Sequence, residues 1–358
     1  MSFYLTAHLA LLFLGLYYET LNSKDLRSVK KRVPNYFFTI PSFVLLFIIS
    51  AFRGDFTTDY KNYTMLFHRY NQYEFWDALR LTSTETGYIF LSRLIGVFTD
   101  NEVVLFAVVS FVILICFYSQ INKQSTYIWL SVLMFVTIGS FYSSFNIMRQ
   151  ILATAIIFAG SKFLYERNFF KYLLVVMLAT LFHQSSLIMI GFYFLLNLRI
   201  NLRNLLVMFL GATGLMLSFD IIISVVQTYF YTSYTDSAYG MTGASFNIAI
   251  LPLAILVFCM FNVNKLDSSD MKQKVWLNAV IFYALFSLLS TQVYMAERLT
   301  HFFAPYALLL VPYIISRINP PNKRLLFMTL FISLMILYHL VVFSGTQYDP
   351  FYFIWESL

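Results

Sequence analysis

Residues 103–118 read VVLFAVVSFVILICFY, an apolar run without a single charge. A run of this kind is typical of a helix that crosses a bilayer, which needs about 20 mostly apolar residues. Strands of a membrane barrel would instead alternate in polarity over about 10 residues, so we exclude a barrel. The rest of the chain continues the pattern, since 59% of its 358 residues are hydrophobic and 11% are charged. Soluble domains carry about 25% charged residues. We therefore exclude a soluble enzyme and predict an all-α polytopic membrane protein.

Working outward from this run, we find twelve apolar segments that are candidates for transmembrane helices. They are 2–19, 35–52, 103–118, 126–142, 146–164, 169–184, 186–198, 203–219, 247–263, 275–292, 300–316 and 324–343. Residues 87–98 and 221–232 are apolar but too short to cross, and we predict helices lying in the membrane interface. We treat 1–358 as one transmembrane domain, with a large outer loop at 53–102 and a second at 220–246.

The basic residues set the expected orientation. With strict alternation of twelve spans, 17 of the 24 Lys and Arg fall on one side, which the positive-inside rule makes cytoplasmic, and 7 fall on the other. Both termini then lie outside. The three long polar stretches, 53–102, 233–246 and 344–358, lie outside with them. Because all the long loops share one face, we expect the working site on that face.

Three of the outer cations, Arg53, Arg149 and Arg298, lie at the membrane edge of a predicted span. Arg149 and Arg298 begin spans that run inward, so each lies near an outward-facing helix N-terminus. Such a terminus already presents free N–H groups and a positive dipole, which makes a cation unfavourable unless an anion joins it. One hypothesis is a bidentate cradle for a phosphate or pyrophosphate. The other is an ion pair with a loop acid. The candidate acids are Glu297 for Arg298, and Asp55 or Asp59 for Arg149.

The other outer cations have simpler explanations, because they lie in or beside acid-rich segments near the interface, where solvent or lipid headgroups suffice. They are Lys61, Arg69, Arg80 and Arg93. His183 ends a predicted span within FHQSS, and two interpretations remain open. It is either a cap stabilised by the helix dipole or a group that titrates near neutral pH.

Two classes of ligand are not expected. No HExxH, CxxC or carboxylate cluster with metal spacing occurs, so we predict neither a metal site nor a cofactor. No basic stripe with interleaved aromatics occurs, so we predict no nucleic acid partner.

Several short motifs follow one another in a fixed order. After Arg53 come TTDYKNY (57–63), ETGY (85–88), NIMRQILA (146–153), FHQSS (182–186) and ERLTHFF (297–303). This ordered set resembles the EpsG-type branch of the Wzy polysaccharide polymerases, whose members show R…G-T-D-Y-x-x-Y, E-P-G-Y/F, M-R-Q-x-L-A, F-H-x-S-A and a late R. Thr57, Thr86 and Ser186 stand where glycine, proline and alanine are usual. These departures affect loop shape and leave the charged positions intact.

The resemblance implies an inner-membrane glycosyltransferase, GT-C-like in architecture, that joins undecaprenyl-diphosphate-linked oligosaccharide repeat units at the periplasmic face. Its partners would be the lipid-linked donor and acceptor, membrane lipid and a chain-length regulator protein. The motif residues carried over are Arg53, Asp59, Tyr60, Tyr63, Glu85, Arg149, Gln150, His183 and Arg298. As a hypothesis, Arg149, Arg298 and Arg53 bind the diphosphate. His183, Glu85 and Asp59 are candidates for the general base, with His183 preferred. Tyr60, Tyr63 and Gln150 bind substrate.

Alternatives stay open for the acids and for the function. Asp59 and Glu85 have a structural interpretation, as Asx-type bonds in TTDY and as a helix N-cap in ETGY. An O-antigen ligase would use the same donor with lipid A as acceptor. A flippase would move the lipid-linked sugar without extending it. Flippases need mid-membrane polarity and often show internal repeats, and neither is visible here. Only the ordered motifs favour a polymerase over a ligase.

Overall fold

The computed structural model describes residues 2–22, 33–81, 85–199, 201–217, 246–292, 295–343 and 350–356. Within these ranges the chain is helical, without a strand, and one antiparallel bridge joins Arg53 to Phe353. The all-α class is therefore confirmed. The interfacial helix predicted at 221–232 and nearly all of the predicted loop at 220–246 lie outside the described residues.

The helices follow the predicted apolar segments closely. The first half of the chain contains α1 (Ser2–Asn22), α2 (Tyr36–Ala51), α3 (Thr58–Gln72), α4 (Phe75–Leu81), α5 (Thr86–Gly96), α6 (Glu102–Gln124), α7 (Ile128–Thr137), α8 (Ser140–Asn146), α9 (Met148–Ala159), α10 (Lys162–Tyr165) and α11 (Phe169–Thr180). The second half contains η2 (Gln184–Ile188), α12 (Met189–Leu196), α13 (Leu202–Leu217), α15 (Asn247–Phe261), η3 (Val263–Lys265), α16 (Met271–Leu289), α17 (Met295–Ser316), α18 (Pro321–Phe343) and η4 (Ile354–Glu356). Each of the twelve segments contains a helix.

Fewer of these helices are long enough to span a membrane unaided. Among the described residues, α6, α17 and α18 have the length and composition for it. A fourth span results if α7 and α8, which meet at a 43° bend, act together. The bend is at Gly139, whose φ of 86° is a left-handed value that glycine adopts readily. The number of twelve crossings and their orientation stay predictions.

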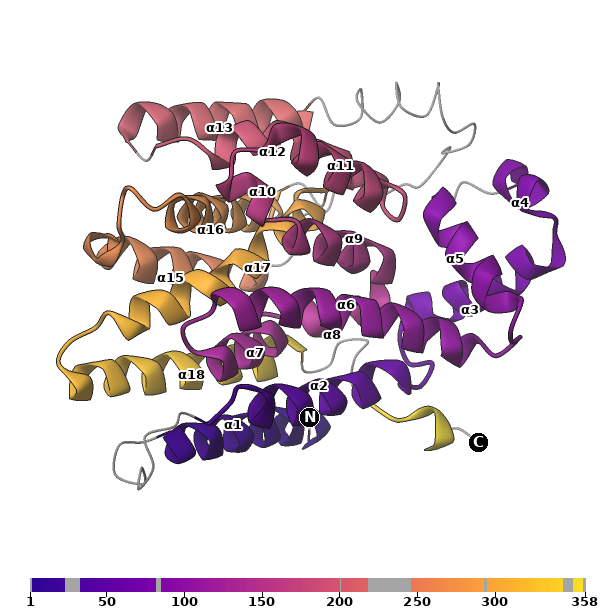
Figure 1. The fold of residues 1–358 in the computed structure, drawn as a ribbon, viewed down its shortest axis with the longest axis horizontal. Helices are drawn as coiled ribbons and strands as arrows, with labels where there is room; N and C mark the ends of the chain where they lie inside the picture. The colour runs from indigo at the N-terminus through magenta and orange to yellow at the C-terminus, as the bar shows by residue number, and fades with distance from the viewer. Residues whose placement is uncertain are drawn as a thin grey trace.

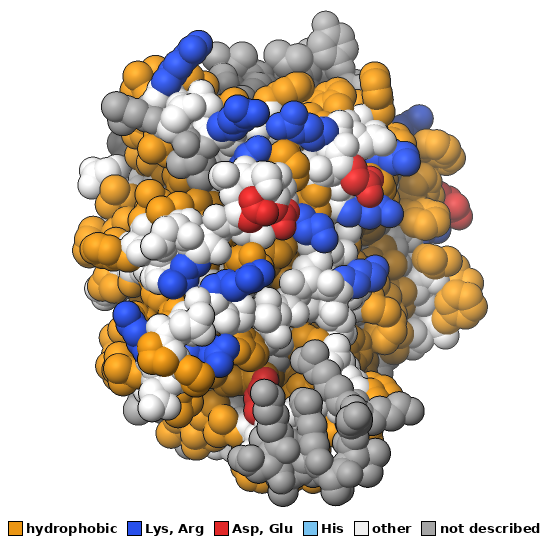
Figure 2. All heavy atoms as spheres, turned by 60° about the vertical axis from the view of Figure 1, so that its left-hand side comes forward, with side chains coloured by type: hydrophobic (Ala, Val, Ile, Leu, Met, Phe, Trp, Pro, Cys, Tyr) orange, Lys and Arg blue, Asp and Glu red, His pale blue; other side chains and the backbone are white. Residues whose placement is uncertain are grey.

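The two ends of the helix bundle differ in character (Figure 1). One end, on the right of Figure 1, carries α3, α4, α5 and the C-terminal segment, and we call it the loop end. The rings of Phe3 and Phe351 stack 3.8 Å apart, so the N-terminal residues lie beside this C-terminal segment. The opposite end carries the α10–α11, α12–α13, α15–α16 and α17–α18 connections, and we call it the basic end. Figure 2 shows Lys and Arg side chains spread over the basic end, with few Asp or Glu.

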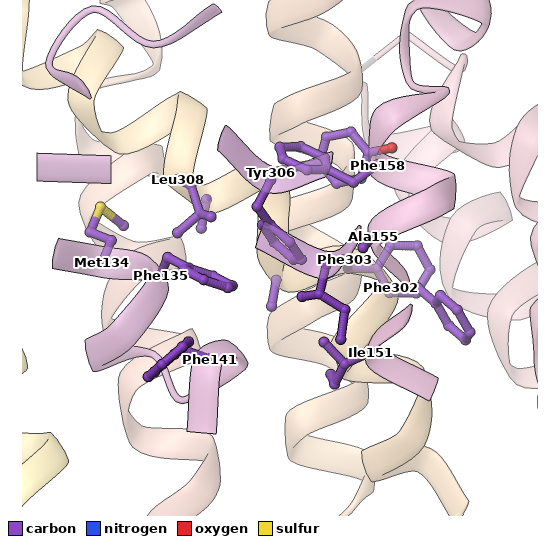
Figure 3. Close-up of a cluster of buried hydrophobic side chains, with 14 of the residues drawn as sticks. Met134, Phe135, Phe141, Ile151, Ala155, Phe158, Phe302, Phe303, Tyr306 and Leu308 are labelled. Carbon is purple, nitrogen blue, oxygen red and sulfur yellow. The ribbon is translucent and has the colours of Figure 1, made fainter. Parts of the chain in front are cut away.

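A core of buried side chains holds α9 beside α17 (Figure 3). Phe158 of α9 meets Tyr306 of α17 edge to face, with ring centroids 5.6 Å apart. On its other side α17 packs along α16, where the rings of Phe286 and Phe303 stack 5.7 Å apart. Close packing of this kind holds helices together in lipid, where apolar surface gains little from leaving the solvent. The packing keeps the first turns of α9 and α17 next to each other.

A candidate active site at the loop end

The first turns of α9 and α17 are joined by one hydrogen bond. The buried Gln150 side chain donates from Nε2 to the carbonyl oxygen of Arg298. Arg149 is the second residue of α9, and Arg298 is the fourth residue of α17. The two arginines therefore lie on neighbouring helix N-termini. The amide nitrogen of Gln150 is used in holding the helices together, and its contact with substrate stays a prediction.

Arg149 forms an ion pair, and its partner is Glu85, neither of the acids that the sequence suggested. Arg149 Nη1 donates to Glu85 Oε2, and the Tyr88 ring centroid lies 5.7 Å from the guanidinium carbon. The Glu85 side chain is 8% exposed. Glu85 occupies the N-cap position of α5 but makes no side-chain capping bond. The N-cap position predicted for ETGY is therefore confirmed, but the Glu85 side chain pairs with Arg149 and does not cap the helix.

The second oxygen of Glu85 faces the FHQSS motif. Its Oε1 lies 3.3 Å from His183 Nδ1 and accepts a 3.3 Å hydrogen bond from the backbone N–H of Gln184. Burial opposes the charge of Glu85, but the Arg149 guanidinium and His183 outweigh burial and lower the pKa of Glu85 to about 2. Glu85 is thus a carboxylate at neutral pH and a weak proton acceptor. Such a group orients an imidazole by fixing which ring nitrogen carries the proton.

A close backbone approach also joins ETGY to Leu181, the residue before FHQSS. The backbone N–H of Gly87 donates to the carbonyl oxygen of Leu181 at 2.8 Å. A Cβ at position 87 would lie only 2.7 Å from that oxygen, so the approach needs glycine. Helix α11 ends at Thr180, and His183 lies beyond it at the start of η2. Both ring nitrogens of His183 are buried, and neither has a hydrogen-bond partner among the described residues, although Nδ1 faces the Glu85 carboxylate.

Helix α3 is attached directly to the segment that precedes Arg149. The side-chain oxygen of Asn146 accepts hydrogen bonds from Thr58 Oγ1 and from the backbone N–H of Asp59, both at 3.1 Å. Thr57 Oγ1 donates to the carbonyl oxygen of Phe145 at 3.2 Å. The TTDY motif thus sits on the start of NIMRQILA, and its placement explains how Asp59 reaches the arginines.

Asp59 is a different kind of acid from Glu85. Burial raises the pKa of Asp59, and the 3.3 Å hydrogen bond from Asn62 together with the charges of Arg149 and Arg298 offsets only part of that rise. Asp59 is half-buried and makes no ion pair with a described cation. Of the two acids, Asp59 is therefore the better proton acceptor.

Comparison with known proteins identifies the family of this chain. The chain matches the model of the EpsG family over residues 35–353, a range that contains every motif residue. The chain belongs to the EpsG family. Membership makes it a membrane protein of polysaccharide biosynthesis. No curated protein and no solved structure matches the chain.

Two of the motif residues of this EpsG-family chain lie in a neighbouring aromatic cluster. Arg53 is 1% exposed, and its guanidinium carbon lies 4.6 Å from the Phe106 ring centroid and 5.1 Å from that of Phe145. The buried Tyr60 ring stacks on Phe106 with centroids 4.3 Å apart. Tyr63 is also buried, but it flanks Arg149. Stacking of Tyr60 or Tyr63 on a sugar stays a prediction, and their rings are enclosed by protein here.

The C-terminal segment covers the Arg53 cluster, which the sequence did not indicate. The backbone N–H of Gly54 donates to the carbonyl oxygen of Tyr352 at 2.8 Å, and that of Ile354 donates to the carbonyl oxygen of Phe52 at 3.0 Å. The Tyr352 hydroxyl donates to Asp55 and lowers the pKa of that carboxyl. This EpsG-family chain therefore closes its first long loop with its own tail.

Some residues of the site were not singled out in the sequence. His301, one helical turn after Arg298, lies close enough to His183 and Arg298 for their charges to interact. The sequence feature that could have identified His301 is its i, i+3 spacing from Arg298, which places both residues on one face of a helix. No sequence pattern identified Asn146 and Gly87, because their roles depend on segments distant in sequence.

Arg93, expected at the interface, instead donates from Nη1 to the carbonyl oxygen of Tyr70 at 2.8 Å. Among the described residues, no group of three His, Cys, Asp or Glu could hold a metal.

Proposed function

We propose that this protein is an inner-membrane polysaccharide polymerase. It joins undecaprenyl-diphosphate-linked oligosaccharide units at the periplasmic face, which is the loop end, and releases undecaprenyl diphosphate. The observation that carries the proposal is a convergence at that end. Two arginines on adjacent helix N-termini lie beside a histidine whose Nδ1 faces a buried carboxylate.

The arginines act on the leaving group. As the bond between the anomeric carbon and the diphosphate oxygen breaks, negative charge grows on that oxygen. Preorganised donors in a site that excludes water stabilise such charge strongly. Arg149 and Arg298 supply guanidinium groups, and the first turns of α9 and α17 add a positive dipole. The pairing with Glu85 uses Arg149 Nη1, while its buried Nε has no described hydrogen-bond partner.

His183 acts on the acceptor. A hydroxyl at the non-reducing end of the incoming unit attacks the anomeric carbon of the growing chain, and its proton passes to His183 Nε2. The Glu85 carboxylate, 3.3 Å from Nδ1, favours the tautomer that carries the proton on Nδ1, and in that tautomer Nε2 is the basic nitrogen. The new glycosidic bond forms, the diphosphate leaves with the electron pair, and His183 then releases the proton to water. Asp59, near both arginines, is the second candidate for the base.

Reconstituted protein tests this proposal. Proteoliposomes containing the purified chain receive a radiolabelled undecaprenyl-diphosphate-linked repeat unit. We expect labelled chains longer than one unit, with one undecaprenyl diphosphate released for each glycosidic bond formed. The exposed Arg69→Ala variant should match wild type, and His183→Ala should not extend the chain. Movement of the unit across the membrane without growth, or transfer only to added lipid A, would contradict the polymerase.

A further inference from the structure

A cavity of about 880 Å³ lies at the basic end, far from the site described above. Three cations from separate segments line it. Arg167 comes from the α10–α11 connection, Arg199 from the α12–α13 connection, and Lys274 from the first turn of α16. The positive-inside bias explains why cations lie at this end. It does not explain why three of them face one cavity.

The cations in this cavity form no ion pair within the part of the chain that the structure describes. Among the described residues, no carboxylate pairs with Arg167, Arg199 or Lys274, and both arginines act on Lys274 as like charges. Asp267 is the one acid in the lining, and its Oδ1 accepts from the N–H of Ser269 at 2.8 Å and from its hydroxyl at 2.6 Å. Like charges that share a cavity repel one another, so an anion between them would be stabilised.

The backbone around the cavity adds to this positive potential. Arg167 lies two residues before α11 and Arg199 three residues before α13, whereas α16 contributes Met271, Gln273 and Lys274 to the lining, so one helix N-terminus, that of α16, borders the cavity. Helix N-termini favour anions. Arg167 also has a φ of 52°, a left-handed value that an arginine seldom adopts. This conformation ends α10, where the backbone N–H of Asn168 donates to the carbonyl oxygen of Phe163 at 2.9 Å, and it turns the chain at the cavity.

We infer that this cavity binds a phosphate group, carried either by the headgroup of an anionic phospholipid or by a soluble phosphate ester. Guanidinium groups suit phosphate because their paired N–H donors match its oxygens. Basic pockets between helices at the cytoplasmic side of a membrane protein are suited to lipid phosphates. The cavity lies at the opposite end from Arg149 and Arg298, so the inference does not depend on the proposed polymerase activity.

Two probes on the intact protein test the inference. Native mass spectrometry compares binding of phosphatidylglycerol with binding of phosphatidylcholine. Hydrogen exchange in detergent follows protection of residues 263–277 as pyrophosphate is added, a local readout that a phosphate at the loop end would not produce. We expect phosphatidylglycerol to be retained or residues 263–277 to be protected. Lipid binding alone identifies a headgroup as the source, and protection by pyrophosphate identifies a soluble ester.

A pocket variant and a matched control decide the result. The pocket variant carries Arg167→Gln, Arg199→Gln and Lys274→Gln, and we expect it to bind either probe about 100-fold more weakly, from about 1 kcal/mol per cation. The control removes three exposed cations elsewhere at the basic end, with the same change of charge and little loss of binding expected. They are Lys123→Gln, Lys162→Gln and Lys323→Gln.

Three outcomes would overturn the site. In the first, wild type and the pocket variant bind the probes equally. In the second, the control variant loses as much binding as the pocket variant. In the third, wild type binds neither probe. If the pocket variant does not fold, a diazirine-bearing phosphatidylglycerol or pyrophosphate probe on wild type replaces it. Cross-links at Arg167, Arg199 or residues 263–277 then support the site, and cross-links confined to other segments contradict it.

Discussion

The cations at the two ends of the bundle are held in different ways. At the loop end, Arg149 pairs with Glu85, Arg53 is enclosed by aromatic rings, and the carbonyl of Arg298 accepts a bond from Gln150. At the basic end, Arg167 and Arg199 are exposed and have no described ion-pair partner. Cations at the basic end agree with a rule about topology. In the predicted orientation those at the loop end violate that rule, and the fold provides a carboxylate partner for Arg149 and an aromatic enclosure for Arg53.

This difference indicates where directed chemistry can occur. A buried guanidinium whose partners fix its position provides preorganised donors, whereas an exposed one must be ordered by its ligand. We therefore expect substitutions at the loop end to change rate, and substitutions at the basic end to change binding or topology.

The largest expected effect is at His183. If its Nε2 accepts the proton of the attacking hydroxyl, His183→Ala should lower the rate of chain extension by about 100- to 10,000-fold. Single-turnover extension in proteoliposomes measures this rate, with binding of the lipid-linked unit followed separately. Lys162→Ala, an exposed cation at the basic end, is the matched control and should extend chains normally. A fully active His183→Ala protein would leave Asp59 as the candidate base.

The two arginines come next. Loss of one preorganised donor costs about 2.7–4 kcal/mol at the transition state, so Arg149→Ala and Arg298→Ala should each slow extension by about 100- to 1000-fold. Lysine should rescue poorly at either position, because an ammonium lacks the planar fork. Chain extension by each purified variant, compared with Arg69→Ala, measures the effect.

The ion pair with Glu85 gives Arg149 a structural interpretation as well, and a double variant separates the two. Arg149→Ala leaves a buried carboxylate unpaired and should lower stability. Arg149→Ala combined with Glu85→Gln removes that charge and should recover stability without activity if Arg149 also binds the diphosphate. Recovery of both would show that Arg149 serves only to neutralise Glu85.

The sequence predicted the helices and the N-terminal positions of Arg149 and Arg298, because apolar length and charge bias are local signals. The resemblance to family motifs also identified Glu85, Arg149 and His183 as candidate residues of one site. The sequence did not predict which acid pairs with which arginine. The Glu85 pairing depends on the approach of Gly87 to Leu181, and the position of Asp59 depends on Asn146. Contacts between segments so far apart in sequence leave no periodic pattern.

The Glu85 ion pair should also make the loop end sensitive to acid. Its pKa falls from the ordinary 4.5 to about 2 in the folded protein, so its contribution to stability is complete above pH 4.5. As the pH falls from 4.5 to about 2, roughly 3 kcal/mol should be lost. Thermal unfolding in detergent, measured across this range, should show the loss in wild type and not in Glu85→Gln. Equal pH dependence in both proteins would mean that Glu85 is not the responsible group.

The smallest expected effect compares two glycines. A Cβ at Gly87 would lie 2.7 Å from the Leu181 carbonyl oxygen, whereas a Cβ at Gly214 in α13 meets nothing within 4 Å. Gly87→Ala must push α5 away from the end of α11, and we expect a loss of about 1–3 kcal/mol in stability. Gly214→Ala should be neutral or stabilising by about 0.5–1 kcal/mol, because alanine favours a helix.

Because displacement of α5 also carries Glu85 away from His183, Gly87→Ala should lower the rate of extension more than its loss of folded protein explains. Unfolding curves and extension rates on the same preparations test this coupling. If Gly87→Ala extends chains at the wild-type rate, then α5 does not position Glu85 for catalysis, and the contact with His183 is only structural.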